Sequence, residues 1–382
     1  MTGARSCSAI RSPWLTIRAG PHALTILRER GLRAIDVDVL PAASGGAKWL
    51  AIAGLDRFLF GHFLQTPRDQ PLHGIGSSIG SWRLACLAQH DPLAALARGH
   101  EAYIHHQRYS PRPGPDEVTQ VLSACLDHLL GPTGAEEILG HPWLRTHVIT
   151  VEGRGPTASR RRMAIAAGLA LAAASNLLAR RTLGAQMTRT IFHAAGVVSP
   201  FSTLRDLPTA FRTLTAQNAR DVLLASGSIP LLLHGVRIDG VPGVHWDGGI
   251  TDYHPDLDFG PGDGLVLYPH FYPHIVPGWF DKALPWRRAS AANFSRAVLI
   301  APSAAFVASL PGGKIPDRRD FHDLPETERI RRWTQVEQRS EALGDALHEL
   351  IETGRLAEIA QPWSARGQDP HEDRTRTWNV RR

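Results

Sequence analysis

The chain has 382 residues, of which 43% are hydrophobic and 20% charged, and this balance is typical of a globular protein with one large or two ordinary domains. A mean hydropathy of −0.16 argues against a polytopic membrane protein. The net charge of +6 suits an anionic membrane surface, nucleic acid or an arginine-rich composition. Because no aromatic RNA-binding motif, Cys/His finger spacing or sustained basic helix accompanies it, we expect no nucleic-acid partner.

The cysteines indicate neither a disulfide framework nor a thiolate metal site. Cys7, Cys86 and Cys125 are odd in number, far apart and without CxxC pairing, so we expect free thiols. The first thirty residues contain five arginines and no continuous apolar run, which is unlike a secretory signal. We therefore expect a cytoplasmic protein, with peripheral contact to a membrane as an open alternative.

The N-terminal part of the chain predicts a helix and then a strand that leads through glycines into a second helix. The first helix starts at Pro21 and ends before Gly31. Apolar and polar residues alternate over residues 35–40, which predicts a strand. Residues 41–46 contain proline and glycine and break the pattern, and helical spacing of apolar residues starts at Trp49.

The same order recurs at residues 71–90, with a strand at 72–75 and an apolar helix at 79–87. Two successive units of this kind are typical of parallel sheets with helical crossovers. Further candidate strands lie at residues 147–151, 190–193, 244–246, 265–268 and 297–300. The chain therefore predicts an α/β fold in which helices cover both faces of a mostly parallel sheet.

These patterns also predict a domain organisation. We expect an N-terminal extension at residues 1–32, a main domain at 33–305, a C-terminal helical segment at 306–360 and a disordered tail at 361–382. Within the main domain, helical insertions are expected near residues 92–140 and 160–181, and long loops over 253–294.

A candidate nucleophile lies in the pentapeptide GSSIG at residues 76–80, where Gly76 and Gly80 flank Ser78. A nucleophile elbow is a sharp turn between a strand and a helix that raises a serine above the sheet, and glycines prevent collisions with the neighbouring backbone. The pentapeptide alone is common by chance. Its position between a predicted strand and a predicted helix is what favours a catalytic Ser78.

A serine nucleophile needs a base, and none of the 19 histidines is distinguished by its spacing. Asp247 is a better candidate because it ends a short predicted strand and is followed by two glycines, so it could face Ser78. An Asp-Gly pair is also a common turn signal, which is the structural alternative for this residue.

A third glycine turn, SGGAK at residues 44–48, lies at the other predicted strand-to-helix junction. The backbone N–H groups of Gly45 and Gly46 could there bind an oxyanion at the start of a helix. Nucleophile, base and oxyanion donors would then all follow the carboxyl ends of strands, where open α/β sheets place their sites.

With these motifs the chain resembles the patatin-like phospholipase family. The resemblance rests on four motifs in the family's order, over roughly residues 33–255: SGGAK at 44–48, GSSIG at 76–80, ASGSIP at 225–230 and DGG at 247–249. It implies a three-layer α/β/α sandwich and a lipid acyl hydrolase with a Ser78 and Asp247 dyad, no histidine and no cofactor.

In the mechanism that the resemblance implies, Asp247 takes the proton of Ser78, the serine attacks an ester carbonyl, and Gly45 and Gly46 stabilise the oxyanion. Lys48 occupies the family's basic position, so it is either a contact for a head-group phosphate or a solvated lysine. Ser44 replaces the family's first glycine and Trp49 its small residue after the basic position, which bears on the choice of substrate.

The most apolar stretch, residues 160–181, has arginines at both ends. It is marginal in length for a membrane span, so a buried helix, an interfacial or lid helix and a span are all open. If the helix is interfacial, we expect Ile165 and Leu169 on its lipid-facing side and the flanking arginines against anionic head groups.

The sequence thus favours a serine acyl hydrolase that acts on lipid or other carboxylic esters. One alternative is a catalytically silent protein of the same fold that binds lipid or a partner. The other is a metal-dependent hydrolase built on the acidic and histidine residues of the segment 247–258, namely Asp247, Asp252, His254, Asp256 and Asp258.

Overall fold

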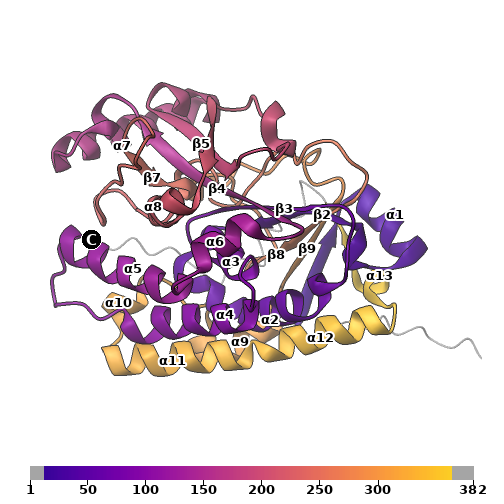
Figure 1. Ribbon diagram of the computed structural model, residues 1–382. Coiled ribbons are helices and arrows are strands. Elements are labelled where there is room, and N and C mark those ends of the chain that lie inside the picture. Colours follow the sequence, from indigo (N-terminus) through magenta and orange to yellow (C-terminus); the bar gives the residue numbers. More distant parts are fainter. Residues whose placement is uncertain (1–12, 364–382) are drawn as a thin grey trace, which may run out of the picture.

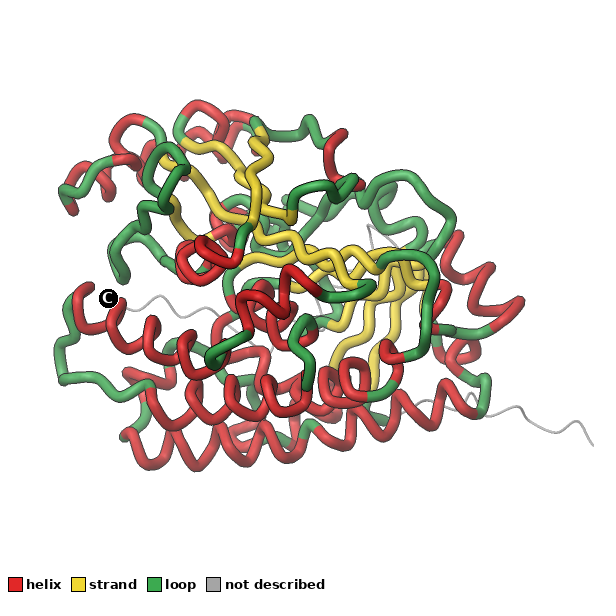
Figure 2. Tube along the Cα trace, viewed as in Figure 1, coloured by secondary structure: helices red, strands yellow, loops and turns green. Residues whose placement is uncertain are grey.

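The computed structural model describes residues 13–363, and its centre is a twisted, mostly parallel sheet with helical layers that make a three-layer α/β/α arrangement (Figures 1 and 2). The strand order is β10-β1-β9-β8-β2-β3-β4-β5-β6, and β7 pairs with β4 beside this path. The fold class predicted from the sequence is confirmed. The strands are β1 (Leu15–Ala19), β2 (Val37–Ala42), β3 (Leu72–Ser77), β4 (Leu144–Gly153), β5 (Met187–Ala194), β6 (Thr209–Leu214), β7 (His245–Asp247), β8 (Leu265–Pro269), β9 (Ala297–Pro302) and β10 (Gln361–Pro362).

The strands β9, β8, β2, β3 and β4 run parallel to one another at the centre of the sheet. Every residue of β8 and β9 is buried, as expected for parallel strands that are covered on both faces. In the register of β2 and β3, Ala42 lies opposite Gly76. The turns that follow these two strands therefore lie side by side at the carboxyl edge of the sheet.

A layer of helices that includes α2, α4, α11 and α12 runs along the lower side of the sheet in Figure 1. The start of α12 is joined to α2 by a hydrogen bond from Gly54 N to Ser340 Oγ at 2.8 Å. The helices are α1 (Pro21–Arg30), α2 (Ala53–Gly61), α3 (Ile79–Leu87), α4 (Pro92–Glu101), α5 (Pro115–Leu130), α6 (Gly134–Gly140), α7 (Arg162–Leu178), α8 (Ala216–Ser226), α9 (Ala304–Ser309), α10 (Asp320–Asp323), α11 (Glu326–Arg339), α12 (Glu341–Glu352) and α13 (Leu356–Ile359).

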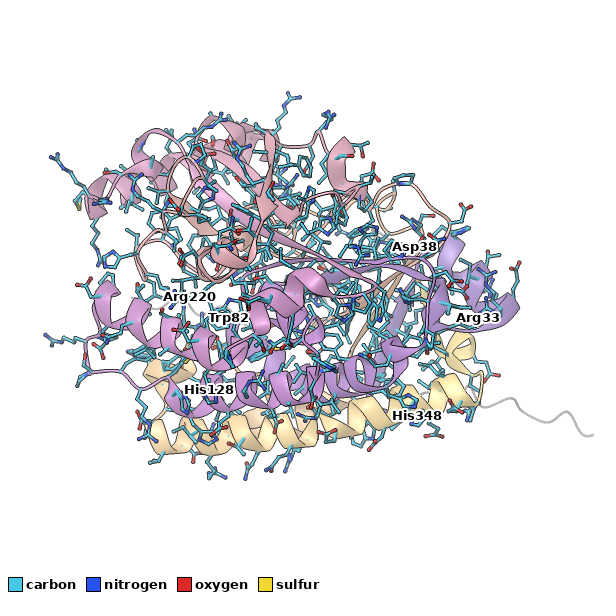
Figure 3. All side chains as sticks on the ribbon, viewed as in Figure 1. Arg33, Asp38, Trp82, His128, Arg220 and His348 are labelled. Atoms are coloured by element: carbon cyan, nitrogen blue, oxygen red, sulfur yellow. The ribbon has the colours of Figure 1, made fainter. Side chains whose placement is uncertain are left out.

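The helix that follows the candidate elbow is held from two sides. Trp82 on α3, labelled in Figure 3, donates its indole N–H to Leu223 O of α8 at 3.0 Å. Its neighbour Arg83 forms a fully buried, bidentate pair with Asp56 of α2. A buried, bidentate charge pair permits few alternative arrangements, so α3 is fixed relative to both helices.

The ends of the main domain differ from the expected ones. Residues 15–19, expected in an N-terminal extension, form β1 and pair with β9 inside the sheet. Residues 361–362, expected in a disordered tail, form β10 beside β1, and the remainder of that tail from residue 364 lies outside the described residues. The helix expected from Trp49 begins as a 3₁₀ turn, Gly46–Ile52, and continues as α2.

The apolar segment of residues 160–181 folds as the helix α7 followed by a short 3₁₀ turn. Ile165 and Leu169, which we expected on the lipid-facing side if the helix is interfacial, are instead 7% and 8% exposed and pack in a core cluster with Trp246 and Ile250. The lipid-facing side expected for an interfacial helix was therefore wrong, because sequence periodicity does not show which of two apolar faces is covered. Within residues 13–363, no helix is both long and apolar enough to cross a membrane.

Candidate active site

Ser78 lies in a strained turn between β3 and α3. Its φ of 54° and ψ of −133° are rarely adopted by a residue with a side chain, and such strain persists only where the surroundings enforce it. The flanking glycines allow this approach. A Cβ at Gly80 would lie 2.1 Å from Ala42 O of the neighbouring strand, and one at Gly76 would lie 2.8 Å from the carbonyl carbon of Gly80. The strand and helix that the sequence predicts around this turn are β3 and α3, and the role of Ser78 as a nucleophile stays a prediction.

The backbone of Ser78 is held by a residue to which the sequence analysis gave no role. Ser226, the last residue of α8, accepts a hydrogen bond from Ser78 N at 2.9 Å and donates one to Ile149 O at 2.7 Å. Ser226 belongs to the segment ASGSIP at residues 225–230. The resemblance of this segment to a family motif was the one sequence feature that could have pointed to Ser226.

Asp247 and Ser78, 169 residues apart in the chain, are in direct contact. Ser78 Oγ donates to Asp247 Oδ2 at 2.8 Å, and Gly249 N donates to Asp247 Oδ1 at 2.6 Å. The backbone of Asp247 is fixed by a bond from its N–H to Ser228 O at 2.9 Å and by pairing with Thr150 of β4. Both side chains belong to nearly buried residues, 9% exposed for Ser78 and 6% for Asp247.

Burial raises the pKa of Asp247 to about 6, while the hydrogen bonds from Ser78 and Gly249 and the positive charges of Lys282 and Arg318 limit that rise. At neutral pH the carboxylate is therefore ionised, yet it is more basic than an exposed aspartate. A proton acceptor whose pKa lies near the working pH is effective in general base catalysis.

The turn at Ser44–Gly45–Gly46 lies next to the elbow. Ser44 Oγ is 2.7 Å from Ser77 Oγ and 3.2 Å from Ser77 O, so this serine ties the turn to the elbow. Gly46 has a φ of +54° and begins the 3₁₀ turn. Within the described part of the chain, the N–H groups of Gly45 and Gly46 donate to no carbonyl or side chain. Two unpaired donors thus remain for a ligand.

Positively charged side chains lie near Asp247. Lys48 follows the glycine turn and is partly buried, and burial lowers its pKa. Lys282, in the 3₁₀ turn Trp279–Ala283, places its ammonium 3.6 Å from the centre of the Tyr253 ring. Burial of that ammonium and the charge of Lys48 lower the pKa of Lys282 to about 7. No sequence pattern pointed to Lys282, because it lies in a long loop segment without a motif.

The acidic and histidine residues after Asp247 do not gather around one point. Asp252 pairs with Arg189 through two hydrogen bonds, and Asp256 accepts from Asn293 and from Ser290 N. His254 Nδ1 accepts from Val276 N, and Asp258 accepts from Gly260 N. Across residues 13–363, no three His, Cys, Asp or Glu side chains are grouped as a metal site requires. The alternative of a metal-dependent hydrolase built on segment 247–258 is not supported by this arrangement.

No protein-family model matches the chain, and no curated protein is significantly similar to it in sequence. Among solved structures, human GIVD cytosolic phospholipase A2 aligns with a TM-score of 0.31 and 12% identity. The alignment covers 88% of this chain and 63% of that one, so the chain spans less than two thirds of the length of that phospholipase. A likeness at this score does not bear on activity.

Proposed function

We propose that the protein is a serine acyl hydrolase that cleaves carboxylic esters, lipid esters among them, with Ser78 as nucleophile and Asp247 as base. The observation that carries the proposal is the 2.8 Å hydrogen bond from Ser78 Oγ to Asp247 Oδ2 at a strained strand-to-helix turn. A nucleophile within hydrogen-bond reach of a base that a third group orients is the pattern of activated serines. Gly249 N is that third group here.

In the acylation step, Asp247 accepts the hydroxyl proton as Ser78 Oγ bonds to the carbonyl carbon of the ester. The electron pair of the C=O bond moves to its oxygen, which the N–H groups of Gly45 and Gly46 bind. Collapse of this intermediate breaks the bond to the alcohol oxygen, which takes the proton back from Asp247. The products are the free alcohol and an acyl group on Ser78.

Deacylation repeats these steps with water. Asp247 takes a proton from the water as the water oxygen attacks the acyl carbonyl carbon, and the N–H groups of Gly45 and Gly46 again bind the oxyanion. The intermediate then releases the carboxylic acid, and Asp247 returns the proton to Ser78. One carboxylate is enough because its raised pKa lets it accept and donate a proton in turn.

The pKa of Asp247 predicts how the rate of hydrolysis depends on pH. Because Asp247 must be ionised to accept the proton and its pKa is about 6, kcat/KM should fall about tenfold per pH unit below this value. Lys282→Gln removes a positive charge that lowers the pKa of Asp247, so the acidic limb should move to higher pH. The measurement is hydrolysis of a soluble acyl ester between pH 4 and 9 in the presence of a chelator.

Arg28→Gln is the matched control for Lys282→Gln. Arg28 is exposed on α1, so its removal changes net charge equally while leaving Lys282 in place. We expect the control to keep the acidic limb of the native protein. If the acidic limb of the pH profile does not move in Lys282→Gln, the role of Asp247 as base is contradicted. If the chelator abolishes activity, a metal-dependent reaction is favoured.

A further inference from the structure

The helix α7 carries an exposed apolar stripe on the side opposite its packed face. Met163, Leu171, Leu177 and Leu178 are 80%, 53%, 56% and 85% exposed. Exposed alanines at 167, 170 and 174 fill the spaces between them at helical spacing. Large apolar side chains scattered singly on a surface are ordinary, but a continuous stripe along one helix marks a surface that meets another apolar phase.

Arginines border this stripe and no acidic residue accompanies it. Arg160, Arg161 and Arg162 are exposed at the start of α7, and Arg181 is exposed just after its end. Residues 153–205 contain no aspartate or glutamate. An apolar stripe with cationic ends complements a surface that is apolar inside and anionic at its rim. A bilayer with anionic lipids has both properties.

The opposite face of α7 packs on the strand that carries Asp247. Ile165, Leu169 and Ala172 share a core cluster with Trp246 and Ile250, the residues on either side of the DGG segment. Trp246 also donates its indole N–H to Thr157 O at 2.9 Å, just before the helix. In Figure 1, α7 lies at the outer edge of the molecule with β7 beneath it. The stripe is therefore one packed layer away from the candidate base.

The C-terminal turn of α7 is also joined to the segment that carries Lys282. Asn176 Nδ2 donates to Asp281 Oδ1 at 2.8 Å, and Arg287 donates to Asn176 O at 2.6 Å. Trp286, next to Arg287 in the chain, is 63% exposed. Tryptophan is favoured at membrane interfaces because its ring is apolar and its N–H is polar. Trp286 is thus an exposed side chain of interfacial type on a segment that is joined to the C-terminal turn of α7.

We propose that the exposed face of α7, together with Trp286, docks the protein on an anionic lipid surface. The apolar stripe enters the boundary between head groups and acyl chains, and the flanking arginines contact anionic head groups. This orientation brings the Asp247 side of the molecule toward the lipid. The lipid esters of that surface are the substrates that the proposed hydrolase would meet there, but docking itself does not require the hydrolytic reaction.

The test is co-sedimentation of the full-length Ser78→Ala protein with vesicles of phosphatidylcholine alone or mixed with phosphatidylglycerol. Binding is expected to the mixed vesicles and to weaken as salt increases. Leu171→Gln combined with Leu178→Gln keeps the net charge and suits a helix, so it removes only apolar contact. Binding should then fall about tenfold or more, because two leucines no longer enter the lipid.

Val198→Gln is the matched control, because Val198 is 88% exposed and lies outside α7. It should bind vesicles like the parent protein, and melting curves should show both variants folded. The proposal is overturned if the parent protein does not bind anionic vesicles or if the leucine variant binds them as well as the parent does. It is also overturned if the parent is a dimer that the leucine variant dissociates, since the stripe then covers a second copy of the chain.

These measurements separate docking from catalysis. If docking fails while the native protein hydrolyses soluble esters, the hydrolase proposal stands and α7 has another role. If docking succeeds in the Ser78→Ala protein while the native protein hydrolyses no ester, the surface is a lipid-binding site on a protein that is not this hydrolase.

Discussion

Replacing Ser78 by alanine or Asp247 by asparagine is expected to lower kcat/KM for a soluble ester by about 10⁴-fold or more. Alanine removes the oxygen that would form the acyl intermediate. Asparagine keeps the size of the side chain and an acceptor for Gly249 N, but it has no basic oxygen for the proton of Ser78. Steady-state kinetics of both variants with one substrate measure the effect.

The double variant should be no less active than either single one, because the two residues act in one step and their effects do not add.

A second test of Asp247 follows from the stability of the fold. The pKa of Asp247 is raised by folding, so the folded protein loses stability as pH rises from the unfolded value of about 4 to about 6. Above this window Asp247→Asn should be at least as stable as the native protein in thermal unfolding. A variant that is inactive only because it unfolds would contradict the assignment.

Gly46→Val is expected to lower kcat by about 10²- to 10³-fold, the usual effect of losing one oxyanion donor. The φ of +54° at Gly46 disfavours a β-branched residue, and an added Cβ would lie 3.2 Å from Tyr103 Oη. The turn should therefore rotate and carry its N–H away from the carbonyl oxygen. Because an oxyanion forms only during the reaction, the change should appear mainly in kcat.

Gly31→Val is the matched control for this experiment. Gly31 has a φ of +73°, ends α1, and has open space where a Cβ would lie. The substitution should cost about 1 kcal/mol or more of stability through the same backbone strain while kcat stays unchanged. Near-native turnover of Gly46→Val would mean that the oxyanion donors lie elsewhere.

The elements around the site could be predicted because short local patterns define them. The alternation over residues 35–40 and the glycines at 45, 46, 76 and 80 identify two strand-to-helix turns. Parallel pairing of β2 and β3 then brings these turns together, as expected at the carboxyl edge of a sheet. Asp247 was identified by its position before two glycines and by the family resemblance.

Other features depend on contacts that no local pattern encodes. The strand β1 was missed because its pairing partner β9 is nearly 300 residues away in the chain. The buried face of α7 is decided by Trp246 and Ile250, which come from a distant strand and turn. Lys282 acts on Asp247 from a loop without a motif, through tertiary position alone.

The most direct measurement is mass spectrometry of the native protein after treatment with a fluorophosphonate, a reagent that phosphorylates activated serines. The account predicts one adduct, on Ser78, that forms in the presence of a chelator and is lost or much slower in Asp247→Asn. It would be contradicted by a native protein that remains unmodified, or by an adduct on a different serine while Ser78 stays free.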